Sequence, residues 1–473
     1  MTALDILTAV LLGFSVMVLV YFLVANTTYL LIHLTAIGEL RRLMKELAFE
    51  STYQRFGSPF LPGIAIVVPA YNEAPVIVSS VRSFLDLRYP DLEVIVVNDG
   101  STDDTLHRLV DQFDLEAVDA RPPRDLPCEP VRAVYRSTHD RGLTVIDKEN
   151  GGKADALNAG VYLTEKPLFC AVDADSIIER DALLSVAQPF LEHPEQTVAT
   201  GGVVRVANGC SISEGTVEEV RLSRKPLVGL QTMEYMRAFF SGRIGLSNLK
   251  SLMIISGAFG LFDTRVVREV GGYRSDTITE DMELVVRMHR YLIEQGRDYR
   301  LEFVPEPVIW TRVPEDRTTL SRQRRRWHRG LFQTISLHRS MVGNPKYGVT
   351  GVFALPFFAG VEGFGPIVEG TGYVVIPVAF VLGIVDGWFL VVFLLLAVFL
   401  NMFLSWLSVF SEVLSFRRYE RPRDVVLLLG YGILENVLYR QWRTIVLLRG
   451  FIEFLQGIDS WGAMERSGFG IED

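Results

Sequence analysis

Two long apolar stretches near the ends of this 473-residue chain limit how it can fold. Ile6 to Ile32 and Gly387 to Ser411 contain no charged side chain. A membrane-spanning helix needs roughly 20 apolar residues, so each stretch is long enough to cross a bilayer. Phe364 to Val385 is another candidate span, although Glu369 and Pro377 interrupt it. The chain is therefore predicted to combine membrane helices at both ends with a soluble region between them.

The segments next to these candidates are less clearly apolar. Val352 to Phe364 is predicted to be an interfacial helix that leads into the second span. Val425 to Leu434 is short and is followed by Glu435, so it is either a further span or a helix on the membrane surface. A cleaved signal peptide is the alternative for the first stretch. That stretch is too long for the apolar region of a signal peptide, and no basic segment precedes it.

Basic residues on the flanks predict the orientation, because basic loops tend to stay in the cytoplasm. The first span is followed by His33, Arg41, Arg42 and Lys45. Arginines also flank the C-terminal block, at Arg322 to Arg329 before it and at Arg417 to Arg423 after it. We therefore expect an N-terminal transmembrane helix in residues 1–38 and a cytoplasmic domain in residues 39–345. Residues 346–473 are expected to hold the interfacial helix, two or three transmembrane helices and a short tail.

Charge and cysteine content argue against several classes of protein. The formal net charge is -9 and no long tail of one sign occurs, so no nucleic-acid partner is expected. The cysteines, Cys128, Cys170 and Cys210, are far apart and odd in number. This spacing disfavours both a disulfide framework and a metal site, and it fits reduced thiols that face a cytosol-like compartment.

Four short apolar runs in the soluble region each end in polar residues. The runs are Ile64 to Val68, Glu93 to Val97, Leu143 to Ile146 and Leu168 to Val172. Such runs, separated by helix-length segments, predict buried parallel strands whose carboxyl ends meet at one ligand-binding edge. The polar residues expected at this edge are Asn72, Glu73, Asp99, Lys153, Asp173 and Asp175. Any one of them alone could cap a helix, but four such ends in succession favour a binding site.

The segment from Asn150 to Lys153 is predicted to contact an anion. Its two glycines let backbone amides approach a phosphate, and Lys153 adds a compact positive charge. The dinucleotide motif G-x-G-x-x-G and the P-loop motif G-x-x-x-x-G-K-[ST] do not occur in the sequence. The two classes of site that depend on them are therefore disfavoured.

Asp173 and Asp175 lie two residues apart just beyond a predicted strand. Alternate residues of an extended segment project in the same direction, so both carboxylates can face one ion. Hard oxygen ligands suit Mg²⁺ or Mn²⁺, whose coordination substrate phosphate oxygens can complete. A solvated turn is the alternative for an isolated D-x-D pattern. Its place in this row of strand ends favours the metal site.

Seven short motifs follow one another in order. They are VVPAYNE (Val67 to Glu73), VNDGSTDDT (Val97 to Thr105), NGGKADALNAG (Asn150 to Gly160), VDADS (Val172 to Ser176), SGAFGLF (Ser256 to Phe262), TED (Thr279 to Asp281) and Q-x-x-R-W (Gln323, Arg326, Trp327). With this set, the region from Ile64 to Gly330 resembles the family 2 glycosyltransferases, particularly the processive synthases of cellulose, hyaluronan and poly-N-acetylglucosamine. The resemblance implies an α/β, Rossmann-like GT-A domain for nucleotide-diphospho-sugars, joined to α-helical transmembrane segments.

The resemblance implies a role for each matching residue. Those expected to bind the UDP-sugar are Tyr71, Glu73, Asp99, Lys153, Asp173 and Arg326. Asp99 is expected to hydrogen-bond the uracil, and Asp175, with Asp173, to hold the Mg²⁺ or Mn²⁺ ion. Glu280, Gln323 and Trp327 are expected on the acceptor side. Trp310 is a further acceptor candidate that could equally belong to the core.

Asp281 is expected to be the general base, since an alcohol acceptor needs a carboxylate to remove its proton as it attacks. The alternative for Thr279 to Glu283 is helix-start capping, because acids in a first turn also stabilise a helix dipole. One base opposite one leaving group favours direct displacement, which inverts an α-linked donor to a β-linkage.

The expected reaction is metal-dependent transfer of a sugar from a UDP-sugar onto a growing β-linked polysaccharide, processive and coupled to export through the inner (plasma) membrane. The alternatives are a glycolipid synthase that adds one sugar to a membrane lipid, and an inactive relative that acts as a receptor or scaffold. Expected partners are the donor, a carbohydrate or lipid acceptor and the lipid membrane, with export or regulatory subunits left open. Glu362, Glu369 and Glu435 are costly in lipid, so they either support helix packing or line a path for the sugar chain.

Overall fold

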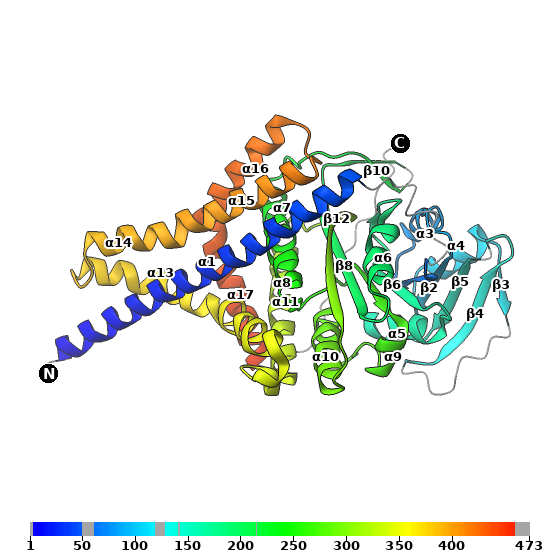
Figure 1. Ribbon diagram of the computed structural model, residues 1–473, viewed down its shortest axis with the longest axis horizontal. Helices are drawn as coiled ribbons and strands as arrows, with labels where there is room; N and C mark the ends of the chain where they lie inside the picture. Colours follow the sequence, from blue (N-terminus) through cyan, green and yellow to red (C-terminus); the bar gives the residue numbers. More distant parts are fainter. Residues whose placement is uncertain (1–2, 50–60, 119–127, 141, 214, 459–473) are drawn as a thin grey trace.

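The computed structural model describes residues 3–49, 61–118, 128–140, 142–213 and 215–458. Residues 119–127 and the C-terminal residues 459–473 are among those that lie outside this description. A sheet domain lies at one end of the molecule, and long helices project from it toward the N-terminus (Figure 1).

The sheet domain contains a ten-stranded mixed sheet of order β3-β4-β5-β2-β1-β6-β11-β8-β12-β7. Its centre is formed by β1 (Ile64–Ala70), β2 (Leu92–Asp99), β5 (Leu143–Lys148) and β6 (Leu168–Val172). The pairings β5–β2, β2–β1 and β1–β6 are all parallel, and β6 has the bounds expected from its apolar run. The predicted buried parallel strands are thus present.

Antiparallel strands extend the sheet on both sides. The outer strands are β3 (Leu115–Val118), β4 (Val131–Ser137), β7 (Ile177–Ile178), β8 (Thr197–Val206), β11 (Phe259–Asp263) and β12 (Arg300–Thr311). Strand β11 pairs antiparallel to both β6 and β8, and β12 runs parallel to β8. A separate two-stranded sheet joins β9 (Ser211–Ser213) to β10 (Thr216–Glu219).

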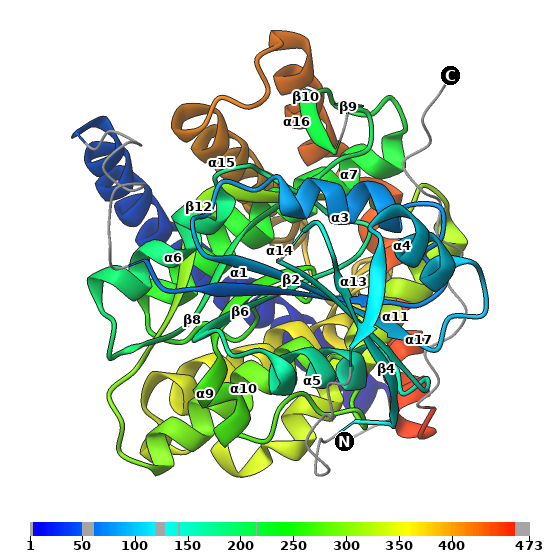
Figure 2. The same cartoon turned by 90° about the vertical axis from the view of Figure 1, so that its right-hand side faces the viewer.

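Helices cover both faces of the large sheet. They are α3 (Ile77–Leu85), α4 (Thr105–Gln112), α5 (Lys153–Leu163), α6 (Ala182–Glu192), α9 (Thr264–Glu269) and α10 (Glu280–Glu294). Figure 2 shows α3 on one side of the sheet and α5, α9 and α10 on the other. Apolar side chains of the sheet and of the helices that cover it form one continuous hydrophobic core, as expected for an α/β domain.

Three helices in the described part of the chain are long and apolar enough to span a membrane. They cover Leu4–Arg42, Thr350–Val381 and Gly387–Ser415. The first belongs to α1 (Ala3–Phe49), which continues past residue 38. The second includes the segment expected to be an interfacial helix, because η4 (Thr350–Ala354), α12 (Leu355–Phe357), η5 (Phe358–Gly363) and α13 (Gly365–Val381) follow one another directly. The third consists of α14 (Gly387–Leu394), η6 and α15 (Leu400–Ser415).

A layer of helices separates the sheet from these spans. It consists of α7 (Pro226–Met236), η1 (Arg237–Arg243), α8 (Ile244–Asn248), α11 (Arg317–Leu337), α16 (Pro422–Leu434), η7 (Glu435–Tyr439) and α17 (Arg440–Leu455). Helix α17 packs on α11 and α13, while α1 packs on η1, α8 and α13. The segment Val425 to Leu434, left open between a span and a surface helix, lies in α16 of this layer and is not among the three candidate spans.

Glycine at position 160 sets the distance between α5 and the centre of the sheet. A Cβ atom added there would lie 2.3 Å from Val67 Cγ1, so a side chain cannot fit without movement of β1 or α5. Gly430 in α16 is a matched contrast, because a Cβ there meets nothing within 4 Å.

We expect Gly160→Ala to lower stability by about 1–3 kcal/mol through overpacking, although alanine is the better helix former. Gly430→Ala should leave stability unchanged or raise it by up to about 1 kcal/mol, because only helix propensity changes there. Apparent melting temperatures of the purified protein in detergent compare the two variants. Equal melting temperatures would contradict the close approach of α5 to β1.

Candidate functional site

The carboxyl ends of the central parallel strands lie together. Ala70 of β1 pairs with Asn98 of β2, and Asp99 pairs with Lys148 of β5. Strand β6 lies on the other side of β1 and ends at Val172, directly before Asp173. The polar residues that follow each strand therefore share one edge of the sheet, as the sequence predicted.

Asp99 shapes the glycine segment after β5. Its Oδ1 accepts hydrogen bonds from Lys148 Nζ at 2.7 Å and from the Gly151 amide at 3.0 Å. Its Oδ2 accepts from the Gly152 amide at 2.8 Å and from Asn150 Nδ2 at 3.2 Å. Gly152 has a φ of 88°, a conformation that favours glycine, and α5 begins at the next residue. Asp99 thus fixes the turn that starts α5.

Lys148 is a buried cation to which the sequence analysis gave no role. Its side chain is completely buried, and it also forms an ion pair with Asp155 in the first turn of α5. The signal in the sequence is a lysine at the end of an apolar run, two residues before Asn150. Lys148 therefore joins Asp99, which binds the amides of Gly151 and Gly152, to Asp155.

Lys153 lies at the centre of an acidic cluster. Its Nζ atom is 2.5 Å from Asp173 Oδ1, 2.9 Å from the Gly257 carbonyl oxygen and 3.7 Å from Glu280 Oε1. Burial by itself lowers the pKa of Lys153, but Asp173 and Glu280 outweigh burial and raise this pKa above its usual value. The ammonium group therefore carries its charge at neutral pH.

Gly257 connects Asp281 to Lys153, because it hydrogen-bonds to both residues. Its Oδ2 accepts a hydrogen bond from the Gly257 amide at 2.9 Å, and its Oδ1 accepts from the Met282 amide at 2.8 Å. A Cβ atom on Gly257 would be 3.2 Å from Asp281 Oδ2 and 3.3 Å from Lys153 Nζ, so only glycine leaves both contacts undisturbed. Lys153 and Gly257 thus link the D-x-D segment to the TED segment by a chain of hydrogen bonds.

Two carboxyl groups of the cluster hold their protons more tightly than usual. Burial, and then Asp173, raise the pKa of Asp175 to about 6, while Lys153 opposes the change. Burial also raises the pKa of Glu280 to about 7, against the charge of Lys153 and with that of Asp281. Neighbouring like charges and desolvation are the causes in both cases.

The donor set fits a divalent cation. A desolvated Asp175 beside Asp173 is a pair of carboxylates that a cation would stabilise as anions. Within the described ranges, no three His, Cys, Asp or Glu side chains converge into a complete protein cage for a metal. Mg²⁺ and similar ions are commonly held by one or two carboxylates together with substrate phosphates, so this arrangement agrees with the residues present.

Helix α11 carries the Q-x-x-R-W residues, of which Arg326 lies near the acidic cluster. Burial lowers the pKa of Arg326, while Glu280, Asp173 and Asp281 oppose the change, so the guanidinium faces the acidic cluster. The Trp327 ring lies 4.6 Å from the guanidinium carbon of Arg324. The buried Gln323 Oε1 has no hydrogen-bond partner among the residues the structure describes.

The segment after β1 is held in place by the loop after β2. Asn72 has a φ of 56°, and its Oδ1 accepts a hydrogen bond from the Thr102 amide at 2.8 Å. The Glu73 amide donates to Thr105 Oγ1 at 2.9 Å, and the Glu73 side chain is buried. Tyr71 is exposed beside them. The roles expected for Tyr71 and Glu73 in a uridine pocket stay predictions.

Trp310 belongs to the core, which settles the two alternatives left open for it. It is fully buried and packs with Ile177 and Ala207. Its Nε1 donates to Glu179 Oε1 at 2.8 Å. The acceptor role considered for Trp310 is therefore not supported.

Arg243 is another residue that the sequence analysis missed. Its guanidinium carbon lies 4.0 Å from the Phe239 ring centroid. Burial lowers the pKa of Arg243 to about 10, and the nearby charge of Asp281 opposes this change. The only signal in the sequence is an arginine inside an apolar helical segment, which does not indicate that it lies near Asp281.

Comparison with known proteins agrees with this geometry. The model of the family described as "Glycosyl transferase family 2" matches residues 65–271. Residues 65–271 therefore form a family 2 glycosyltransferase domain. Poly-beta-1,6-N-acetyl-D-glucosamine synthase of Staphylococcus epidermidis is 28% identical over 274 residues, which are 58% of this chain and 55% of that protein. The Staphylococcus aureus (strain COL) synthase is 28% identical over 276 residues, 58% of this chain and 56% of the relative. The chain thus spans about half the length of these curated relatives.

Among solved structures, the mannosyltransferase PcManGT from Pyrobaculum calidifontis, in complex with GDP-Man and Mn²⁺, is 18% identical and gives a TM-score of 0.49. The match covers 93% of this chain and 99% of that one. The sheet of this family 2 glycosyltransferase, with the D-x-D segment directly after β6, is that of an α/β GT-A domain, and three apolar helices accompany it.

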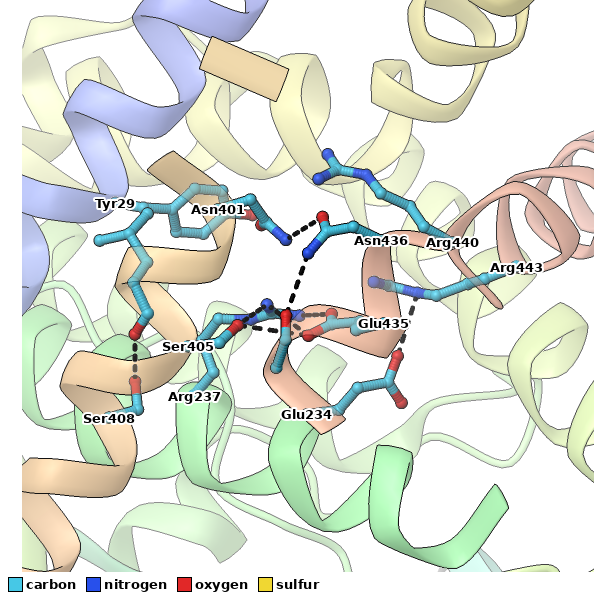
Figure 3. Close-up of polar contacts among 12 residues, drawn as sticks. Tyr29, Glu234, Arg237, Asn401, Ser405, Ser408, Glu435, Asn436, Arg440 and Arg443 are labelled. Carbon is cyan, nitrogen blue, oxygen red and sulfur yellow. Dashed lines mark hydrogen bonds and ion pairs between the residues drawn. The ribbon is translucent and has the colours of Figure 1, made fainter. Parts of the chain in front are cut away.

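The glutamates Glu362, Glu369 and Glu435 pair with protein groups, and Figure 3 shows the contacts of Glu435. Glu435 binds Arg237 at 2.5 Å and accepts from Ser405, and Glu369 binds Arg440 at 2.7 Å. Glu362 accepts a hydrogen bond from Tyr29 of α1. The alternative of helix packing is therefore observed for all three. The contacts of Glu369 and Glu435 connect spans to the helical layer, and the contact of Glu362 joins two spans to each other.

His33 is likewise part of this packing. It was counted among the basic residues that follow the first span, but it is fully buried in the glycosyltransferase. Its Nδ1 lies 2.6 Å from Ser241 Oγ, and its Nε2 lies 3.4 Å from Ser411 Oγ. His33 therefore joins α1 to η1 and α15, and it contributes less to the orientation argument than Arg41 and Arg42 do.

We expect Lys148→Met to destabilise the glycosyltransferase by about 3–5 kcal/mol, because it leaves the carboxylates of Asp99 and Asp155 buried without their cation. Lys166→Met is the matched control, since Lys166 pairs with the exposed Asp91 and its loss should cost no more than about 1 kcal/mol. Thermal unfolding in detergent measures both. If Lys148→Met unfolds no earlier than Lys166→Met, the structural role of Lys148 is wrong.

Proposed function

We propose that the protein transfers a sugar from a UDP-sugar to the hydroxyl end of a growing β-linked polysaccharide, with inversion and with a divalent cation. The observation that carries the proposal is the short path from Asp173 to Asp281. Lys153 binds both Asp173 and the Gly257 carbonyl, and the Gly257 amide binds Asp281. A donor-binding D-x-D segment and a carboxylate suited to act as a base therefore lie within reach of one substrate.

On the donor side, Tyr71, Glu73, Asp99, Lys153, Asp173 and Arg326 bind the UDP-sugar in this proposal. Asp175, with Asp173, would hold Mg²⁺ or Mn²⁺, which neutralises the charge of a diphosphate leaving group. Lys153 and Arg326 bring two further positive charges to the same cluster. Positive charge placed in advance where the leaving group gains negative charge is a major source of rate enhancement.

Asp281 acts as the general base in this mechanism. Two backbone amides hold its carboxylate at the start of α10, which fixes the direction of its free lone pairs. The carboxylate takes the proton of the acceptor hydroxyl while the hydroxyl oxygen attacks the anomeric carbon and the diphosphate leaves. A single displacement inverts the configuration at that carbon.

On the acceptor side, Glu280, Gln323 and Trp327 contact the sugar chain in the proposal. The Trp327 ring offers an apolar face to a sugar. The buried Gln323 Oε1, for which the described residues offer no donor, is suited to accept from a hydroxyl group. These groups lie on α11 and on the first turn of α10, so the acceptor would enter beside the base.

The curated relatives favour N-acetylglucosamine as the sugar and a processive reaction, since both are poly-beta-1,6-N-acetyl-D-glucosamine synthases. The three candidate spans support a multi-pass protein of the inner (plasma) membrane, with the catalytic domain in the cytoplasm and the product exported. Single addition to a membrane lipid remains the second candidate. The small number of candidate spans is the observation that favours it.

The first test is turnover by the purified protein in detergent. With Mg²⁺ or Mn²⁺, we expect release of UDP from UDP-N-acetylglucosamine, and we expect excess EDTA to abolish it and added metal to restore it. Sizing of the product by gel or mass spectrometry separates a polymer from a single addition. Absence of turnover with any common UDP-sugar would count against the enzymatic proposal, and a product one sugar longer than a lipid acceptor would favour the second candidate.

The second test concerns the base. Asp281→Asn is expected to lower transfer by about 10²–10⁴-fold, because the amide cannot accept the proton, while UDP binding measured by calorimetry is unchanged. Asp276→Asn is the matched control, since Asp276 lies five residues earlier, is exposed and pairs with Arg274 at 2.5 Å. Transfer at the wild-type rate by Asp281→Asn would remove Asp281 from the role of base.

A further inference from the structure

The second half of α11 runs alongside the segment that carries Asp281. A Cβ atom on Gly330 would lie 2.4 Å from the Thr279 side chain, so helix and segment touch there without space for a side chain. One turn later, Gln333 Oε1 accepts a hydrogen bond from the Ile278 amide at 3.1 Å. At the end of the helix, His338 Nε2 lies 3.1 Å from Glu283 Oε1. Three contacts therefore follow one another along the helix that also carries Gln323, Arg326 and Trp327.

Glu283 is the most constrained of these residues. Its side chain is completely buried, although it lies only two residues after Asp281 in the first turn of α10. Arg287 binds it in a bidentate manner, with Nε 3.1 Å from both carboxylate oxygens and Nη2 2.9 Å from Oε2. The same guanidinium donates to the carbonyl oxygens of Val270 and Gly272 at 2.5 and 2.7 Å. The carboxylate thus joins α10 to the loop after α9 as well as to α11.

His338 completes the arrangement. It is the C-terminal cap of α11 and is buried. Among the described residues its Nδ1 has no hydrogen-bond partner, and its Nε2 is the ring nitrogen that contacts Glu283. Burial raises the pKa of Glu283, but the hydrogen bond from His338 and the charge of Arg287 outweigh it and lower this pKa below its usual value.

We propose that Glu283, Arg287 and His338 form a latch that positions the general base relative to the acceptor-binding helix. The inference rests on the proposed function, because the latch is proposed to fix the distance between Asp281, as the base, and the Q-x-x-R-W residues, as the acceptor contacts. The latch residues do not touch the substrate. They hold the first turn of α10 at a fixed place along α11, so that the base and the acceptor contacts move as one unit.

The physical reason is the sensitivity of proton transfer to distance. A base must lie within hydrogen-bonding reach of the acceptor hydroxyl, and a displacement of about 1 Å can lower the rate about 100-fold. Asp281 and the Q-x-x-R-W residues lie on two different helices, so no single rigid element fixes their separation. The buried, charge-assisted contacts of Glu283 supply that connection, and they lie in the same helical turn as the base.

The test compares variants of the latch in the full-length protein. Glu283→Gln keeps the size of the side chain but replaces one acceptor by a donor, which repels either Arg287 or His338. We expect transfer kcat to fall about 10- to 100-fold while the KM for the UDP-sugar and the affinity for UDP stay close to wild type. His338→Leu should behave in the same way, whereas His338→Gln, which keeps a donor, should restore part of the rate.

The double variant Glu283→Gln, His338→Leu shows whether the two residues act as one device. Its kcat should be no lower than that of the less active single variant, since either change already breaks the contact. Glu294→Gln is the matched control. Glu294 lies at the other end of α10, accepts from Arg290 at 3.1 Å and from Tyr347 at 2.8 Å, and its variant should keep the wild-type kcat.

Hydrogen exchange of the peptide that covers residues 278–286 gives a readout that does not need turnover. We expect faster exchange there in Glu283→Gln and in His338→Leu, and no change in Glu294→Gln. Wild-type exchange together with wild-type kcat in both latch variants would overturn the latch. A fall in kcat matched by an equal loss of UDP binding or by global unfolding would also overturn it, because it shows a general structural role. A wild-type protein without transferase activity would contradict the proposed function, and the exchange rates alone would then decide whether the latch exists.

Discussion

The attraction between Lys153 and the acids around it is the interaction on which the site depends. Asp173, Asp175, Glu280 and Asp281 come from two distant parts of the chain, and burial penalises the charged form of each such group. Two unit charges 4 Å apart interact by about 4 kcal/mol at an effective dielectric constant of 20, so one central ammonium offsets a substantial part of this penalty. Lys153 occupies that position because α5 begins at it, immediately after the turn that Asp99 fixes. Lys148 donates to Asp99, so the position of the Lys153 ammonium group also depends on Lys148.

In the helical layer next to the candidate spans, arginines likewise offset the cost of burying glutamates. Glu234 accepts from Arg324 of α11 at 2.5 Å and pairs with Arg443 of α17 at 3.4 Å. Arg325 and Arg329 of α11 pair with Glu453 of α17. Such buried pairs add little net stability compared with apolar packing, but the loss of one partner leaves a charge stranded. Their effect here is to fix α11 against α7 and α17, so the Q-x-x-R-W motif has a defined place between the sheet and the candidate spans.

The sequence predicted the parts of the fold that local pattern determines. Strand β6 has the predicted bounds, and β1, β2 and β5 exceed their apolar runs by one to two residues at most on each side. These strands are buried on both faces, so their pattern is continuous and easy to recognise. The outer strands β8, β11 and β12 were not predicted, because their pairing depends on partners far away in the sequence.

The site shows the same division. The motifs selected Asp173, Lys153, Glu280 and Asp281, which the structure places in one cluster, since motif residues follow strand ends and helix starts. Lys148, Arg243 and Glu283 were given no role, because nothing in their local sequence shows which charges they meet after folding. Trp310, for which a place in the core was one of two open alternatives, and His33, which was counted among the basic flanking residues, show the opposite case. An aromatic ring and a histidine both have plausible surface roles, and only tertiary packing shows that each is buried.

The donor and acceptor halves of the site are therefore built by different means and meet at two small residues. On the proposed donor side, Asp99 and Asp173 take their places from the ends of parallel strands. The acceptor side lies on α11, whose position is set by side-chain contacts with α10 and α17. Gly257 connects Lys153 to Asp281, and Gly330 allows α11 to touch Thr279. A side chain at Gly330 would clash with Thr279, and one at Gly257 would crowd Asp281 and Lys153. In the proposed mechanism, the lack of a Cβ atom at these two positions lets one substrate reach Asp173, Asp175 and Asp281.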